Sequence, residues 1–138
     1  MSESNITLNV NPETVCLLID KVNEFQAKEA VIFPEKIDSS EYEYDPLQIL
    51  ADHRDDLTLL QAHNLIEDLE PDQKADLLAL MYVGRGDFEA EEWHRAQKEA
   101  RTNLSPHLTE YLFGKPQLSE YLTKGLELLG YDYHFQRL

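Results

Sequence analysis

The 138-residue chain is short enough for a single domain, and 42% of its residues are hydrophobic, which is sufficient for one core. Twelve lysines and arginines stand against 27 aspartates and glutamates, so the formal charge is −15. This charge argues against non-specific binding to nucleic acid or to an anionic membrane, because both are polyanions. It is compatible with a basic protein partner, with bound cations or with a solvated acidic surface.

The single cysteine, Cys16, excludes an intramolecular disulfide and a thiolate metal cluster. Residues 1–5 lack the basic and apolar regions of a signal peptide. The longest uninterrupted apolar run, 77–83, is too short to span a bilayer. We therefore expect a cytoplasmic protein that contacts no membrane.

Two elements are predicted at the start of the chain. Apolar and polar residues alternate over 6–10, which fits a short strand or an extended lead-in. A helix is predicted over 12–30, with Asn11 as its N-cap and Pro12 in its first turn. Apolar residues recur within that range at helical spacing.

Residues 34–56 form an irregular acidic connection with eight acidic and two basic side chains. Like charges in a short stretch oppose compaction, so we expect this segment to be the most mobile part of the chain. Tyr42 and Tyr44 lie among its carboxylates and are candidate contacts for a basic, partly apolar partner. The simpler alternative is a solvated loop packed loosely on the domain.

The centre of the fold is predicted to be a helix over 71–83, preceded by a helix over 57–69. Residues 77–83 are apolar all round, so this helix should be buried on several sides. A buried strand is the rival interpretation of a seven-residue apolar run, but the helix formers just before it favour a helix. Gly84 is predicted to take the left-handed position that ends the helix.

Glycines and prolines divide the remaining chain into three further predicted helices. The first begins after Asp87, which is predicted to be its N-cap. The second runs from 105–106 to Gly114, and the third from Pro116 to residue 130. Gly125 interrupts the last helix, which indicates close approach of another backbone.

These elements predict a compact all-α domain of five or six helices over 1–138, with the helix at 71–83 in the centre. The tail at 131–135 alternates aromatic and polar residues. It is a candidate partner for 6–10 in a minor two-stranded pairing of the termini.

The most distinctive stretch is Gly-Arg-Gly-Asp-Phe at 84–88, followed by Glu-Glu-Trp at 91–93. A leucine-rich segment leads into it from residue 77. The pattern Tyr-Leu-x-Gly-x-Pro-x-Leu-x-x-Tyr-Leu-x-x-Gly-Leu follows at 111–126. In these features the C-terminal half resembles a bacterial domain family of unknown function, family number 3775. The resemblance implies no particular activity, cofactor or substrate.

Arg85 lies between two glycines, and we expect it to be a structural anchor that pairs with a carboxylate of another helix. The alternative is a ligand- or partner-binding site formed by the exposed part of this corner, with Arg85, Asp87, Glu92 and Trp93 as candidate residues. Phosphate binding at the helix start is disfavoured because four nearby carboxylates would repel an anion. Adhesion through Arg-Gly-Asp would require an exported protein.

Glu91 and His94 have the Glu-x-x-His spacing of carboxylate di-iron proteins, which need two such helices. Only one is present, so we expect no metal and no cofactor. Nucleophile, phosphate-loop and dinucleotide motifs are also missing. The leading hypothesis is therefore a non-catalytic protein-interaction or regulatory module, with a basic protein partner or self-association. The alternatives are a small enzyme or metal-binding protein using Glu91, Glu92 and His94, and an acidic mimic of nucleic acid.

Overall fold

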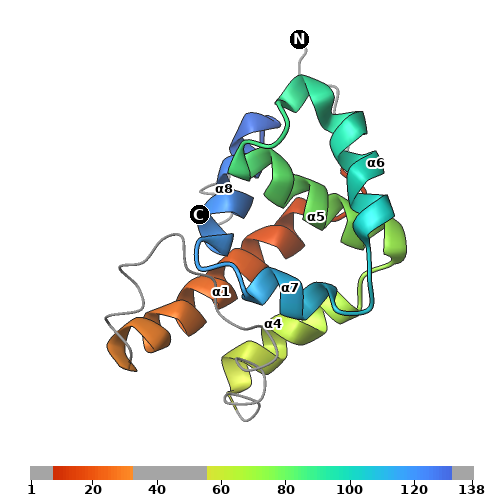
Figure 1. Cartoon of the computed structure of the whole chain (residues 1–138). Helices are drawn as coiled ribbons and strands as arrows, with labels where there is room; N and C mark the ends of the chain where they lie inside the picture. Colours follow the sequence, from red (N-terminus) through yellow and green to blue (C-terminus); the bar gives the residue numbers. More distant parts are fainter. Residues whose placement is uncertain (1–7, 33–55, 132–138) are drawn as a thin grey trace.

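The structure, a computed structural model, describes residues 8–32 and 56–131, with backbone alone for 28–32 (Figure 1). Its elements are α1 (Pro12–Ile32), α4 (Leu57–Glu67), α5 (Pro71–Arg85), the 3-10 helix η1 (Ala90–Glu92), α6 (Trp93–Asn103), α7 (Leu108–Phe113) and α8 (Leu118–Leu128). These described ranges contain no strand, which confirms the predicted all-α fold. In the same ranges no helix combines the length and the apolar character needed to cross a membrane.

Two predictions fall on parts of the chain that are not described. The pairing of 6–10 with 131–135 lies mostly outside the described residues, and those of its residues that are described form no strand. Most of the acidic connection, including Tyr42 and Tyr44, also lies outside them.

Helix α5 is the centre of the fold, as predicted. Every residue from 75 to 83 is buried, because this segment packs against α8 on one side and α6 on another. Figure 1 shows α5 between these two helices. Helix α1 packs against both α4 and α8, so it completes the core from a third direction.

The predicted starts of the first three helices are confirmed, whereas α7 and α8 begin at Leu108 and Leu118, two residues later than predicted. Asn11 Oδ1 accepts from the backbone N–H of Glu13 at 2.8 Å at the start of α1. Asp56 Oδ1 accepts from the N–H of Leu59 at 3.2 Å and caps α4. Pro71 occupies the first turn of α5 as expected. The side chains of Asn11 and Asp56 each satisfy a backbone N–H that the helix leaves unpaired. Pro71 has no N–H and therefore needs no partner at this position.

Asp76 is a fully buried carboxylate that joins three parts of the chain. Its Oδ2 accepts from the backbone N–H of Asn9 at 2.7 Å, and its Oδ1 accepts from Gln97 Nε2 at 2.8 Å. It therefore connects the segment before α1 and helix α6 to the central helix. Hydrogen bonds to both oxygens offset part of the cost of burying the carboxylate.

The predicted role of Gly84 as the end of α5 is wrong. The left-handed residue is Gly86, with φ of 98°, and its N–H donates to the carbonyls of Tyr82 and Val83. Gly84 lies inside the helix, where a Cβ would overlap the carbonyl oxygen of Tyr121 on α8. The missing side chain is needed for helix packing rather than for a positive φ.

Gly125 has the matching role on α8, because a Cβ there would overlap the carbonyl oxygen of Leu80 on α5. The predicted close approach at Gly125 is therefore confirmed. One glycine on each helix lets the two backbones cross in contact. This crossing is the most extensive packing among the described helices.

Candidate functional site

Arg85 pairs with Asp87 in its own turn. Its Nε and Nη2 both donate to Asp87 Oδ2, at 2.9 and 2.7 Å. Although burial acts in the opposite direction, Asp87 and the Tyr111 hydroxyl on α7 raise the pKa of the Arg85 guanidinium above its ordinary value. The predicted carboxylate from another helix is therefore wrong. The left-handed Gly86 turns the chain back so that the Asp87 N–H reaches the carbonyl of Tyr82 at 2.9 Å, which places Asp87 beside Arg85.

Asp87 is consequently not the N-cap of the following helix, and that prediction is also wrong. The N-cap is Glu89, which precedes η1. Its backbone N–H donates to Glu92 Oε1 at 2.9 Å, as in a capping box. The chain extends for two residues past Asp87 before the helix begins, so a cap at Asp87 would be too early.

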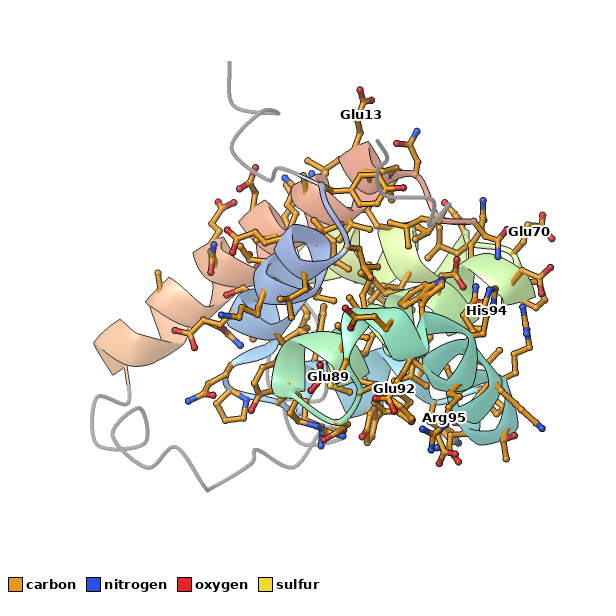
Figure 2. The ribbon with its side chains drawn as sticks, turned by 90° about the horizontal axis from the view of Figure 1, so that it is seen from above. Glu13, Glu70, Glu89, Glu92, His94 and Arg95 are labelled. Atoms are coloured by element: carbon orange, nitrogen blue, oxygen red, sulfur yellow. The ribbon has the colours of Figure 1, made fainter. Side chains whose placement is uncertain are left out.

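Glu92 forms hydrogen bonds at the start of α6, and Trp93 is buried in the core. The second oxygen of Glu92 accepts from Arg95 Nη1 at 2.6 Å, and Trp93 is only 3% exposed. Figure 2 shows Glu92 and Arg95 close together, with His94 apart from them. Of the four predicted corner residues, only Arg85 and Asp87 line a cavity described below.

Among the described residues, the Glu-x-x-His pair has no further metal-ligand side chains gathered around it. Glu91 and His94 are both exposed on the surface. Within residues 8–32 and 56–131, no three His, Cys, Asp or Glu side chains gather closely enough to hold a metal ion.

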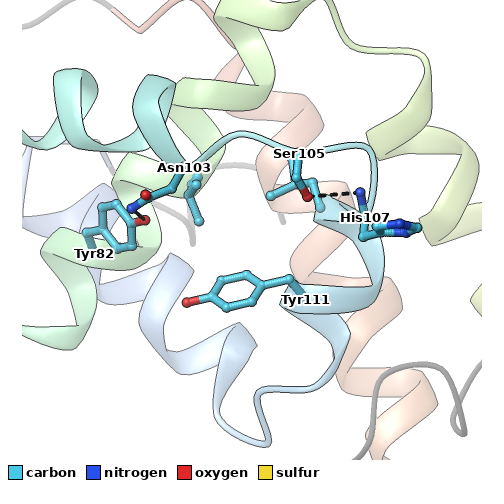
Figure 3. Close-up of a pocket in the computed structure, with 7 residues that line it drawn as sticks. Tyr82, Asn103, Ser105, His107 and Tyr111 are labelled. Atoms are coloured by element: carbon cyan, nitrogen blue, oxygen red, sulfur yellow. Dashed lines mark hydrogen bonds between the residues drawn. The ribbon is translucent and has the colours of Figure 1, made fainter.

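Two adjoining hollows lie between α5, α6 and α7, and we call them together the Tyr82–Tyr111 groove. The first, of about 440 Å³, is lined by Leu78, Tyr82, Asn103, Ser105, His107, Leu108 and Tyr111 (Figure 3). The second, of about 360 Å³, is lined by Tyr82, Arg85, Asp87, Phe88, Glu99, Asn103 and Tyr111. The two hollows share Tyr82, Asn103 and Tyr111, so they adjoin at these residues, and each is called one half of the groove.

Asn103 organises the shared wall of the groove. Its Nδ2 donates to the Tyr82 hydroxyl at 2.9 Å and to Glu99 Oε2 at 3.2 Å. Burial raises the pKa of the Tyr82 phenol above its ordinary value, although the hydrogen bond from Asn103 acts in the opposite direction. The Tyr82 hydroxyl is therefore protonated at neutral pH and keeps a proton to donate.

Tyr111 on α7 is the third residue that both hollows share, and it remains accessible. It is 38% exposed, and its hydroxyl extends toward Tyr82 in Figure 3. Lys115 Nζ lies 4.4 Å from the centroid of the Tyr111 ring, and Arg85 lies 5.7 Å from that of Tyr82. These cation–π contacts hold both rings in place.

The halves of the groove differ in chemistry. The first has the buried side chains of Leu78 and Leu108 in its lining, and none of its lining residues that the structure describes carries a carboxylate. The second contains two carboxylates, Asp87 and Glu99, and one cation, Arg85. The groove therefore offers an apolar half and a charged half beside a common wall of two tyrosines and an asparagine.

The groove contains a serine and a histidine, but they are not arranged as a nucleophile and its base. The Ser105 hydroxyl oxygen accepts from the backbone N–H of His107 at 3.0 Å. In Figure 3 the His107 imidazole points away from Ser105. A general base must reach the proton it removes, so this geometry favours binding over acyl-transfer chemistry.

Sequence reasoning missed the shared wall, Tyr82, Asn103 and Tyr111. Two signals were present: Tyr82 is the one residue with a hydroxyl in the apolar run 77–83, and Tyr111 opens the downstream motif. Asn103 gave no signal, because it acquires its role only where the end of α6 meets α5.

We expect Arg85→Ala to lower the free energy of unfolding by about 1 kcal/mol or less, because ion pairs this exposed contribute little. The side chains of Arg85 and Asp87 are 29% and 41% exposed. Urea denaturation of the wild type and of Arg85→Ala measures the difference, with Arg85→Lys as the control that keeps the charge. A loss of about 3 kcal/mol would instead identify Arg85 as a structural anchor.

Neither the comparison with curated proteins nor that with solved structures gave a significant match. The family model described as "Protein of unknown function (DUF3775)" matches residues 60–131. This range holds the α5–α8 crossing and every residue that lines the Tyr82–Tyr111 groove. It also contains both motifs on which the family resemblance rests. The chain therefore belongs to this family of unknown function.

Proposed function

We propose that the protein is a non-catalytic protein-interaction module that holds a segment of a partner protein in the Tyr82–Tyr111 groove. The observation that carries this proposal is that an apolar hollow and a charged hollow share Tyr82, Asn103 and Tyr111 as lining residues. Tyrosine and arginine are the residue types that contribute most to binding at protein interfaces. Hollows of several hundred Å³ with few polar groups are typical ligand sites.

The competing functions have less support. An enzyme or metal-binding protein using Glu91, Glu92 and His94 would need these side chains to converge, yet Glu92 is engaged with Glu89 and Arg95. A mimic of nucleic acid needs carboxylates in rows at phosphate-like spacing. Such a protein binds through its charged surface and does not require a groove. On sequence grounds we place the protein in the cytoplasm.

The test is the loss of a specific partner when the groove is altered. Tyr111→Ala should weaken binding of a groove partner about tenfold or more, because aromatic anchors commonly contribute above 1.4 kcal/mol. A partner is first isolated with the wild-type protein, then purified and titrated calorimetrically against each variant. Leu128→Ala is the matched control, since Leu128 is an exposed apolar residue of α8, 47% accessible and outside the groove.

The proposal fails if Tyr111→Ala and Asn103→Ala bind every isolated partner as tightly as the wild type. We propose the acidic connection as a second contact surface, on the basis of its charge and of Tyr42 and Tyr44. Tyr42→Ala combined with Tyr44→Ala, titrated in the same way, separates its contribution from that of the groove.

A further inference from the structure

We infer that the Tyr82–Tyr111 groove selects an extended segment in which an apolar side chain and an arginine or lysine lie two residues apart. This inference rests on the proposed function and names the chemistry of the partner. The apolar side chain would occupy the half lined by Leu78 and Leu108. The cation would occupy the half that contains Glu99 and Asp87.

The preference for a cation follows from the charges around the second half. Asp87 and Glu99 supply two carboxylates there, and Arg85 already donates two hydrogen bonds to Asp87. Glu99 accepts one hydrogen bond, from Asn103, and is exposed. It is therefore available to a cation brought by a partner. The formal charge of −15 on the chain acts over longer range in the same direction.

The helix ends strengthen this preference independently of the carboxylates. Helix α5 ends at Arg85 and α6 ends at Asn103, and both residues line the second half. The C-terminal end of a helix carries a partial negative charge from its unpaired carbonyl groups. Two such ends beside one hollow favour a cation and disfavour a phosphate or carboxylate.

An extended chain presents two side chains to adjoining hollows with a spacing of two residues. Side chains at i and i+2 of a strand point to the same side, roughly 7 Å apart. The two halves adjoin along Tyr82, Asn103 and Tyr111, so neighbouring side chains on one face of a segment would enter one half each. The Tyr82 hydroxyl has a proton to donate, and a backbone carbonyl of the segment is a suitable acceptor.

The test uses the full chain, labelled with ¹⁵N, and unlabelled capped pentapeptides. The probe Gly-Leu-Ala-Arg-Gly should shift the signals of Tyr82, Asn103 and Tyr111, with a dissociation constant on the order of 1 mM for so short a peptide. Peptides with glutamate in place of arginine, or serine in place of leucine, should bind several-fold more weakly. Glu99→Gln should weaken binding of the probe about threefold, whereas Glu120→Gln should leave it unchanged.

Glu120→Gln is the matched control because it removes the same charge from an exposed residue of α8, outside the groove. Equal weakening by the two variants overturns the inference, since binding would then depend on the net charge of the chain and not on Glu99 in the groove. Equal binding of the arginine and glutamate peptides also overturns it, while leaving the proposed function intact. Absence of any shift at the groove overturns it as well; the proposed function is judged separately, by the partner titrations with Tyr111→Ala.

Discussion

Gly84→Ala should lower the free energy of unfolding by about 3 kcal/mol or more, because the new methyl group would overlap the backbone of α8. The atom that it meets is the carbonyl oxygen of Tyr121, which belongs to a helix backbone and cannot rotate away as a side chain would. Relief requires the two most extensively packed of the described helices to separate. Since small domains are stable by only about 5–15 kcal/mol, a large share of the folded population would be lost.

The expected change in stability is opposite in sign to that of an ordinary glycine-to-alanine substitution in a helix. In a helix without tertiary contacts, replacing glycine by alanine stabilises by up to about 1 kcal/mol. The expected destabilisation can therefore come only from the crossing with α8. Thermal and urea unfolding followed by circular dichroism measure it, and Gly125→Ala should behave in the same way because its Cβ would overlap the carbonyl of Leu80.

Gly86→Ala is the control within the same turn. A Cβ on Gly86 meets nothing within 4 Å, so its only cost is the positive φ of 98°, about 1–2 kcal/mol. If Gly84→Ala were as stable as the wild type, the contact between the two backbones would be absent in solution. If Gly86→Ala lowered the stability more than Gly84→Ala, the roles assigned to the two glycines would be wrong.

Asp76→Ala is the second substitution with a large expected effect, a loss of about 3 kcal/mol in the free energy of unfolding. The carboxylate is fully buried and accepts from the backbone of Asn9 and from Gln97. Alanine would leave the buried Gln97 amide and the partly buried hydrogen bond of the Asn9 N–H without their acceptor, and it would open a small cavity beside them. Part of the loss should appear as faster hydrogen exchange in residues 8–10, because the contact that holds Asn9 would be gone.

Asp72→Ala is the matched control for this prediction. Asp72 lies one turn earlier on the same helix, its side chain is 73% exposed, and its ion pair with Arg101 has a 4.0 Å separation. Its removal should change stability by less than about 0.5 kcal/mol. Asp76→Asn should fall between the two, because it keeps the volume and one acceptor oxygen but presents a donor to another donor. Equal stability of the Asp72 and Asp76 variants would contradict the buried network.

The helices themselves could be predicted from the sequence, because the signals that specify them are local. The apolar residues of α1 recur at helical spacing, Pro71 fits a first turn, and residues 77–83 are apolar on every side. Each of these features lies within a few residues of the element that it specifies. The family resemblance could also be found from the sequence, because both motifs are continuous in sequence.

The functional site depended on contacts between distant residues, which no local pattern encodes. Tyr82 and Tyr111 face one groove only because α5 and α7 are brought together, and Asn9 meets Asp76 across 67 residues of chain. The same limit explains the error at the glycines. Gly84 and Gly86 both suit a turn by themselves, and the position of α8 decides that one packs against a backbone while the other turns the chain.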